Sequence, residues 1–287
     1  MSRYVVHGAN GAQGAPLLAS LIASGHDAVA AVRKLSPDEN YPQVQVDNSS
    51  IASLIQAYIG AKGVFIHLPV APEEVRLTYA RNIVKAVTQT KPRRVVISTS
   101  GWVVDEPDSP LQNPPESAIS VLIRGVQNSG VSSAVVAPRL FFENLLNPLV
   151  LNTIKAEGIL RYPIRADYQV SWSSHLDVAE VAKSLLLSTG TTGIVGVGQL
   201  PAITGEELAH GFERYLRRPV SFNSVDPEAF GEVISPLLGA EAAAGVVAAY
   251  QTQARANANA ISPATSAQAV LGSRPRSLHE WLVEISA

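Results

Sequence analysis

The chain has 287 residues, of which 46% are hydrophobic and 16% charged, so it can bury a substantial core and is not a disordered segment. Its 22 Lys and Arg residues nearly balance 24 Asp and Glu residues, for a formal net charge of -2, and no basic block stands out. Nucleic acid and anionic membranes are therefore not expected partners. Cysteine is absent, which excludes disulfides, thiol nucleophiles and cysteine-bound metals.

The six histidines are scattered, and no two have the i, i+3 or i, i+4 spacing of a helical metal site, so we expect no metal. No charged segment followed by an apolar run opens the chain, so no signal peptide is predicted. No uncharged apolar run reaches the ~18 residues that a membrane span needs. We therefore expect a cytoplasmic protein.

The first half alternates short apolar, β-prone runs with helical stretches, a pattern typical of a parallel sheet with helices on both faces. Strands are predicted at Tyr4–His7, Asp27–Arg33, Val44–Asp47, Gly63–Leu68, Arg94–Thr99 and Ser133–Ala137. Helices are predicted at Ala15–Ser24, Ile51–Tyr58, Glu73–Gln89 and Ile119–Asn128.

Two capping boxes mark helix starts in the second half. Asp177 stands three residues after Ser174, and Glu207 stands three residues after Thr204. In each pair the side chains and backbone N–H groups of the two residues can bond reciprocally. Helices are therefore predicted at Val178–Leu187 and from Thr204 to Arg217.

The rest of the second half is less regular. Strands are predicted at Ile194–Val197 and Val220–Val225, and the alanine-rich stretch 235–260 is predicted to be helical. The stretch 105–116, DEPDSPLQNPPE, holds four prolines and four acids and is expected to be an irregular loop.

Three glycines, Gly8, Gly11 and Gly14, follow the first strand at three-residue spacing. In a strand-to-helix phosphate cradle, the first permits a tight turn and the second lets the backbone approach a pyrophosphate. The third lets the helix pack closely on the strand. Such a turn also occurs where nothing binds, but the strand–helix–strand context favours a bound phosphate at the helix N-terminus.

The end of the second strand reads AVRK. An NAD site usually carries an acid here to hold the ribose 2′-hydroxyl. Arg33 and Lys34 instead offer positive charge to a 2′-phosphate, which an arginine can bind through two hydrogen bonds. The alternative is a pair of solvated surface cations. We predict NADP(H) as the cofactor.

These residues resemble a known family. GANGAQGAP, AVRK and VDNSSIASLIQAYIGAKGVFIHLP are similar to the NmrA-like group of atypical short-chain dehydrogenases, and more narrowly to its quinone oxidoreductase 2 and triphenylmethane reductase branch. APRLFFENLL, HLDVAEVAKSLL and ITGEELAHGFERYLRRPVSF continue the resemblance over nearly the whole chain.

The resemblance implies contacts with cofactor and substrate. Residues that would line the pyrophosphate are Gly8, Asn10, Gly11, Ala12, Gln13 and Gly14. Further cofactor contacts would be Arg33 and Lys34 at the 2′-phosphate, Asp47 near the adenine, His67, Leu68 and Pro69 at the ribose beside the nicotinamide, and Ser98 and Thr99 near the nicotinamide. Substrate contacts would be Ser100, Trp102, Leu140, Phe141, Phe142 and Asn144.

The catalytic Tyr-x-x-x-Lys pair of ordinary short-chain dehydrogenases has no counterpart at its usual place after the fifth strand. Tyr58 and Lys62 have the spacing, but they precede the fourth strand and enclose Gly60, a helix stop. We therefore assign no catalytic residue. Hydride can still pass directly to a strongly electrophilic acceptor, with a proton taken from water.

For several of these residues, a purely structural role is an alternative to contact with a ligand. Trp102 can stack on a ligand or pack in the core, and Phe141 and Phe142 can wall a cleft or belong to the core. His67 can contact the cofactor or make a structural hydrogen bond. His175 stands beside a helix cap, where a catalytic role is the weaker interpretation.

We expect a doubly wound parallel-sheet Rossmann fold with a smaller mixed α/β C-terminal substrate region. Residues 1–150 would form the NADP-binding domain, with 165–198 returning to it, and 199–287 the smaller region. The leading hypothesis is an NADPH-dependent reductase of a small quinone-like substrate. The alternative is a non-catalytic NADP(H)-binding redox sensor that regulates a protein partner. The sequence does not decide between a monomer and a homodimer.

Overall fold

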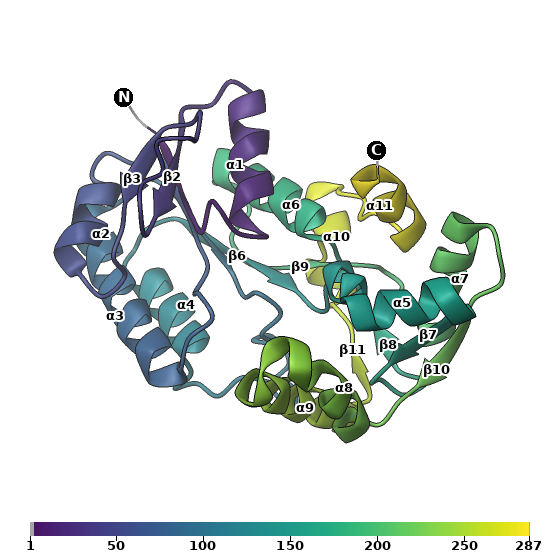
Figure 1. Cartoon of the computed structure of the whole chain (residues 1–287). Helices are drawn as coiled ribbons and strands as arrows, with labels where there is room; N and C mark the ends of the chain where they lie inside the picture. The colour runs from purple at the N-terminus through teal and green to yellow at the C-terminus, as the bar shows by residue number, and fades with distance from the viewer. Residues whose placement is uncertain (1–2, 287) are drawn as a thin grey trace.

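Seven parallel strands form the central sheet of the computed structural model, which describes residues 3–286 (Figure 1). The strands are β1 (Tyr4–His7), β2 (Ala28–Val32), β3 (Gln43–Gln45), β4 (Gly63–Ile66), β5 (Val95–Ser98), β6 (Ser133–Pro138) and β9 (Gly193–Val197). Their order is β3-β2-β1-β4-β5-β6-β9, so the direction of winding reverses between β1 and β4. The predicted doubly wound Rossmann fold is confirmed, and its reversal point is where such sheets bind ligands.

Helices cover both faces of the sheet because successive strand residues point to opposite sides. Val5 packs in the core under α2 (Ile51–Tyr58), α3 (Glu73–Thr90) and α4 (Ala118–Asn128). Val6 packs in the core under α1 (Gly14–Ala23) and α6 (His175–Leu187). Strands β1, β2 and β4 are buried on both faces, which explains why they read as continuous apolar runs.

A third core lies in the C-terminal part, where Phe142 stacks on Trp172 with ring centroids 6.1 Å apart and Trp281 is buried beside them. Its strands pair as β7 (Ile159–Tyr162) with β10 (Ser221–Ser224) and β8 (Gln169–Val170) with β11 (Ala258–Asn259). Its helices are η1 (Phe142–Leu146), α5 (Pro148–Glu157), α7 (Gly205–Leu216), α8 (Pro227–Leu238), α9 (Ala240–Arg255) and α11 (Leu278–Ile285). The short η2 (Pro263–Thr265) and α10 (Ala267–Leu271) lie beside β9 instead, and Ala267 packs in the core under α1 and α6. The boundaries of the predicted substrate region stay a prediction.

The predicted helix over 235–260 is wrong in its bounds. Two helices occupy this part of the chain, because Gly239 takes a positive φ of 84° between α8 and α9 and ends the first of them. The second helix ends at Arg255, before β11 begins. Helices α5, α10 and α11 and strand β7 are absent from the predicted elements.

Both predicted capping boxes are present, at Ser174–Asp177 and at Thr204–Glu207. No helix among residues 3–286 is both long and apolar enough to cross a lipid bilayer. The same residues bring together no group of histidine, aspartate or glutamate side chains that could hold a metal ion.

Candidate functional site

The three glycines form a tight turn between β1 and α1. Gly8 has a φ of +60°, and its carbonyl oxygen accepts the N–H of Gly11 at 2.8 Å. A Cβ on Gly14 would lie 2.3 Å from that same oxygen, so only glycine lets the helix approach the strand this closely. The first turn of α1 has no side-chain cap and no acidic residue. The Ala15 N–H donates to the Gly11 oxygen and Pro16 has no N–H, so among the described residues the N–H groups of Gln13 and Gly14 are the ones left for an anion.

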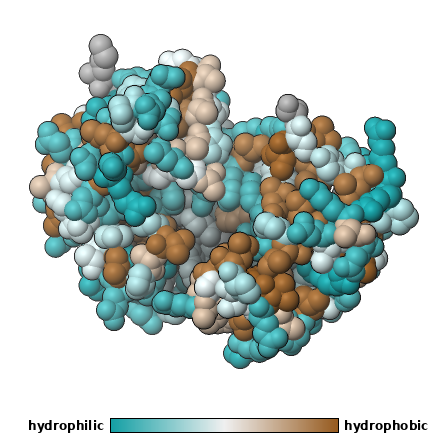
Figure 2. Space-filling view, viewed as in Figure 1, coloured by the Kyte–Doolittle hydropathy of each residue, from teal (hydrophilic) through white to brown (hydrophobic). Residues whose placement is uncertain are grey.

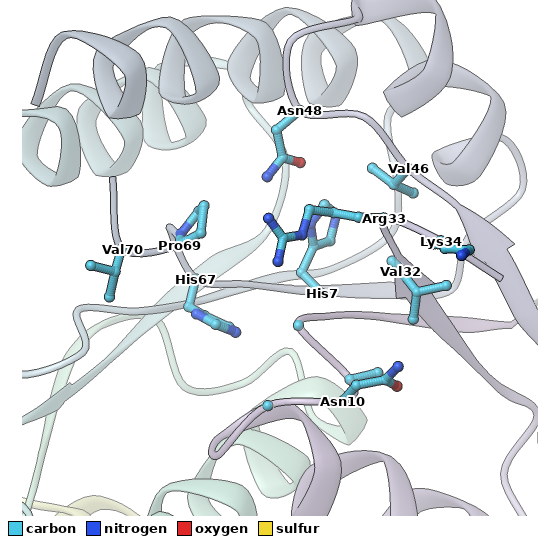
Figure 3. A pocket seen from close by; sticks show the side chains of 14 residues that line it. His7, Asn10, Val32, Arg33, Lys34, Val46, Asn48, His67, Pro69 and Val70 are labelled. Atoms are coloured by element: carbon cyan, nitrogen blue, oxygen red, sulfur yellow. The ribbon is translucent and has the colours of Figure 1, made fainter. Parts of the chain in front are cut away.

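A cavity of about 560 Å³ opens beside this turn, at the carboxyl ends of β1, β2 and β4 (Figure 3). It is lined by His7, Gly8, Ala9, Asn10, Gly11, Ala31, Val32, Arg33, Lys34, Val46, Asn48, His67, Pro69 and Val70. Of the predicted cofactor contacts, it brings together Gly8, Asn10, Gly11, Arg33, Lys34, His67 and Pro69.

Two cations stand at one end of the cavity. Arg33 and Lys34 follow β2 and are exposed, and within residues 3–286 neither side chain has an ion-pair or hydrogen-bond partner. The Arg33 side chain reaches across the cavity, whereas that of Lys34 points away from it (Figure 3). Arg33 is therefore the better placed of the two to meet a bound anion.

Asp47, the residue predicted near the adenine, bonds to its own turn and does not line the cavity. The Asp47 carboxylate accepts the backbone N–H of Ser49 at 2.8 Å and its hydroxyl at 2.6 Å, which lowers the pKa of Asp47. Asn48, rather than Asp47, lines the cavity. Its backbone oxygen accepts an amide N–H of Asn82, and its own buried Oδ1 has no partner among the described residues.

Asn48 is a candidate site residue that the sequence patterns did not reveal. The one available signal was Asn82, a buried amide in the middle of α3 that holds the segment after β3 through the backbone oxygens of Asn48 and Ser49. Sequence alone does not show which of two adjacent polar residues turns inward.

Two neutral histidines form the floor of the cavity. A Cβ on Gly8 would lie 2.1 Å from Nε2 of His67, so the imidazole packs against the glycine turn. His7 Nε2 is 2.7 Å from the hydroxyl of Tyr58. Burial lowers the pKa of both histidines, that of His7 to about 3. Tyr58 therefore serves to pair with His7, which agrees with its exclusion as a catalytic tyrosine.

Gln13 ties the glycine turn to the end of β5. Its Oε1 accepts the Ser98 hydroxyl at 2.6 Å, and its Nε2 donates to Ser100 Oγ at 3.0 Å. Ser98 and Thr99 are buried and lie outside the cavity lining, as does the buried Leu68. Of the predicted contacts around the nicotinamide, these three are thus placed below the surface of the site.

The predicted substrate contacts divide into exposed and core residues. Trp102 is 46% exposed and stacks with the Arg76 guanidinium 5.1 Å from its ring, and Asn144 is also exposed. Phe142 is fully buried, and the half-buried Leu140 packs against the same third core. Phe141 is half-buried, with its ring centroid 4.4 Å from that of His175.

The sequence matches the family model described as "NmrA-like family" over residues 1–282. The chain belongs to the NmrA-like family. No curated protein sequence matches it.

Solved structures similar to this NmrA-like chain share its fold along nearly the whole length. Triphenylmethane reductase of Citrobacter sp., solved with NADP(H), has a TM-score of 0.80 at 18% identity, covering 98% of this chain and 99% of its own. NADPH-dependent quinone oxidoreductase QOR2 of Escherichia coli, solved with NADPH, has a TM-score of 0.75 at 16% identity, covering 99% and 100%. A nucleoside-diphosphate-sugar epimerase of Staphylococcus aureus has a TM-score of 0.79 at 20% identity, covering 98% and 99%.

The NmrA-like chain also carries an acid beside His175. Glu143 Oε1 accepts the backbone N–H of His175 at 2.9 Å and lies 3.4 Å from its Nδ1. From the sequence, His175 is interpreted mainly as a neighbour of the cap formed by Ser174 and Asp177, and Glu143 has no part in that interpretation. Glu143 precedes α6 by more than 30 residues, so no local spacing could reveal the pair.

A buried arginine binds the acidic segment of the 105–116 loop. Arg139, directly after β6, is buried and donates to Asp105 at 3.0 Å and to Glu106 at 2.8 Å. It also donates to the backbone oxygen of Ala260. These two acids are therefore engaged within the protein.

Proposed function

We propose that this protein binds NADP(H) in the cavity beside the glycine turn and reduces a small, planar, electrophilic acceptor of the quinone class. The observation that carries the proposal is the position of Arg33. Its guanidinium reaches into the cavity without a partner among residues 3–286, and α1 begins beside the same cavity with the N–H groups of Gln13 and Gly14 unbonded among these residues. Two anion-binding features along one cavity fit a cofactor with two phosphate positions.

The residues present fit such a cofactor. Gly8 and Gly14 leave no room for side chains of their own and keep the turn open to a pyrophosphate. Arg33 would hold the 2′-phosphate, with Lys34 nearby. The unpartnered Oδ1 of Asn48 would accept an amino group, such as that of an adenine.

A bound NADPH would supply a hydride to the acceptor. The chain itself provides position and shielding from water, which carry much of such a reaction. Gln13 fixes the turn against β5, and His67 closes over Gly8. No Tyr–Lys pair follows β5 in the sequence, which supports direct hydride transfer to an acceptor that needs no strong activation.

The shape of the molecule supports a small acceptor with apolar character. The surface is hollowed between the sheet and the C-terminal helices, and apolar residues border the hollow on the side of α8 and α9 (Figure 2). Two of the similar structures are named as reductases of triphenylmethane dyes and of quinones, and both were solved with NADPH or NADP(H). The same class of substrate is proposed for this chain.

The test is turnover with a panel of acceptors. Purified protein and NADPH are mixed with simple quinones, a cationic triphenylmethane dye and simple aldehydes, and the loss of nicotinamide absorbance is followed. Oxidation of NADPH with quinones or the dye, but not with aldehydes, is the expected result. Turnover of aldehydes alone would contradict the proposed substrate class.

A redox sensor is the second candidate function, favoured by the missing Tyr–Lys pair. A sensor would bind NADPH tightly, but none of the acceptors in the panel would cause it to oxidise NADPH. Tight binding without turnover would therefore replace the reductase by the sensor, and failure to bind either NADPH or NADH would exclude both.

A further inference from the structure

A carboxyl group and an imidazole lie side by side at the carboxyl edge of the sheet. Glu143 belongs to η1, which follows β6, and His175 is the first residue of α6. Glu143 Oε1 is 3.4 Å from Nδ1 of His175 and also accepts its backbone N–H at 2.9 Å. The carboxyl group thereby bonds to the backbone of His175 and lies against Nδ1 of its imidazole.

The imidazole keeps one nitrogen free. Within residues 3–286, Nε2 of His175 makes no hydrogen bond and is not among the buried polar atoms without a partner, so it meets solvent. The side chains of His175 and Glu143 are 17% and 24% exposed. Phe141, a predicted substrate contact, packs on the His175 ring at 4.4 Å. Nε2 is thus available to a molecule bound at this edge.

The surroundings favour an uncharged pair. Glu143 Oε2 is buried without a partner, and burial raises the pKa of Glu143, helped by the nearby Asp177. Burial and the neighbouring His67 lower the pKa of His175 to about 4. Asp177 is engaged by Ser174 and Arg276, so it does not compete for the imidazole. Both shifts favour the uncharged forms, in which the carboxyl can donate its proton toward the imidazole.

We propose that Glu143 and His175 form a proton relay for the acceptor: His175 Nε2 contacts the acceptor oxygen, and Glu143 positions the imidazole and resupplies its proton. The relay rests on the proposed reductase function and deepens it, because it replaces water as the source of the proton. His175 is the catalytic residue of the pair and Glu143 the positioning residue.

The protons and electrons balance in a single step. The acceptor carbonyl gains a hydride, with its electron pair, from reduced nicotinamide, and its oxygen takes the proton of His175 Nε2. Nδ1 takes the proton of the Glu143 carboxyl at the same time. The products are a hydroxyl group, an oxidised nicotinamide, an ionised Glu143 and a neutral imidazole protonated at Nδ1. Solvent returns one proton through the exposed Nε2.

The first test reads the imidazole directly, without cofactor. Nitrogen NMR of the full-length protein between pH 5 and 9 reports which nitrogen of His175 carries the proton, with His175→Asn used to assign the signal. The expected result is a change from Nε2–H to Nδ1–H as Glu143 ionises, and no such change in Glu143→Gln. One tautomer at every pH in the wild type, or an imidazole that simply becomes charged, would overturn the relay.

The second test separates the relay from the proposed function. With an accepted quinone, His175→Asn and Glu143→Gln should lower kcat by about 100-fold or more while KM for NADPH stays within about 3-fold. The alkaline fall in kcat should disappear in Glu143→Gln. His210→Asn, which changes an exposed histidine on α7, is the matched control and should leave kcat unchanged. Unchanged kcat in both relay variants would overturn the proposal.

Failure of the reductase itself has a different signature. If the wild type does not oxidise NADPH with any acceptor of the panel, the proposed function is wrong. The tautomer measurement still decides whether Glu143 and His175 share a proton. If the wild type turns over but its His175 tautomer never changes with pH, the relay alone is wrong.

Discussion

At the residue scale, Gly8 meets two constraints that no other residue type satisfies. Its φ of +60° disfavours a side chain, and the His67 imidazole occupies the space where a Cβ would stand. Gly14 is a different case, because a Cβ there would collide with the backbone oxygen of Gly8, which cannot turn aside like a side chain. The glycine turn is therefore fixed by packing as well as by ligand access.

Alanine substitutions separate these constraints. Gly8→Ala should destabilise the protein by about 2–4 kcal/mol and Gly14→Ala by about 2–3 kcal/mol, and both should weaken NADPH binding. Gly25→Ala is the control, because Gly25 has a φ of +76° but no atom within 4 Å of the position that a Cβ would take, so it should cost only about 1 kcal/mol. Urea unfolding gives the free energies. Equal costs at all three positions would contradict the packing at Gly14.

The buried His7 predicts sensitivity to acid. Its pKa is about 3 in the folded protein, against about 6.5 in the unfolded chain, so protons bind the unfolded state preferentially below pH 6.5. The stability held by neutral His7 is complete above pH 6.5 and is lost as the pH falls toward 3, by up to about 1.4 kcal/mol per pH unit.

Urea unfolding at several pH values between 7.5 and 4.5 measures this effect. His7→Gln removes the titrating group while its amide can still pair with Tyr58, so the dependence of stability on pH should become shallower. His210→Gln should leave the slope as in the wild type. The same slope in all three proteins would show that His7 does not stay neutral in the folded state.

Residues differ in how far the sequence alone predicts their roles. The roles of Gly8 and Gly14 follow from backbone geometry at fixed spacing, so the sequence suffices for them. The choice between Asp47 and Asn48 depends on hydrogen bonds from Ser49 and Asn82, which only the fold brings into reach. Pairs joined across the sheet edge, such as Glu143 and His175, are beyond local patterns for the same reason.

At the element scale, β1, β2, β4 and β5 were predictable because each is a short apolar run buried on both faces. Strand β7 and helices α5, α10 and α11 were missed; each buries only part of its surface, so its apolar pattern in the sequence is weak. The loop at 105–116 is irregular as predicted, but its attachment to Arg139 is a tertiary contact that the sequence did not indicate.

Arg139 is expected to hold that loop in place. Arg139→Met removes the buried guanidinium shared by Asp105, Glu106 and the backbone of Ala260, and should cost about 3–5 kcal/mol. Hydrogen exchange and protease cleavage should increase within 105–116. Arg161→Met, at an exposed pair with Glu157, is the control and should change the stability far less. An unchanged exchange rate in the loop would contradict the role of Arg139.

At the scale of the whole molecule, the proposed cofactor would bind only the folded chain, so it should stabilise the protein. NADPH at about 100 times its Kd should raise the free energy of unfolding by about 2.7 kcal/mol. NADH at the same concentration should raise it less, because it lacks the 2′-phosphate that Arg33 is proposed to hold. Thermal unfolding with each nucleotide checks this order, and equal stabilisation would contradict the predicted preference.

The most direct measurement is a fluorescence titration of NADPH and NADH into the wild type, Arg33→Ala and Arg81→Ala. Arg81 is exposed on α3 outside the cavity lining, so its variant matches the change in charge. Arg33→Ala should weaken NADPH binding about 10- to 100-fold, a loss of about 1.4–2.8 kcal/mol, and change NADH binding by less than about 3-fold. Arg81→Ala should behave as the wild type. Equal affinity of the wild type and Arg33→Ala for NADPH would contradict the proposed cofactor site.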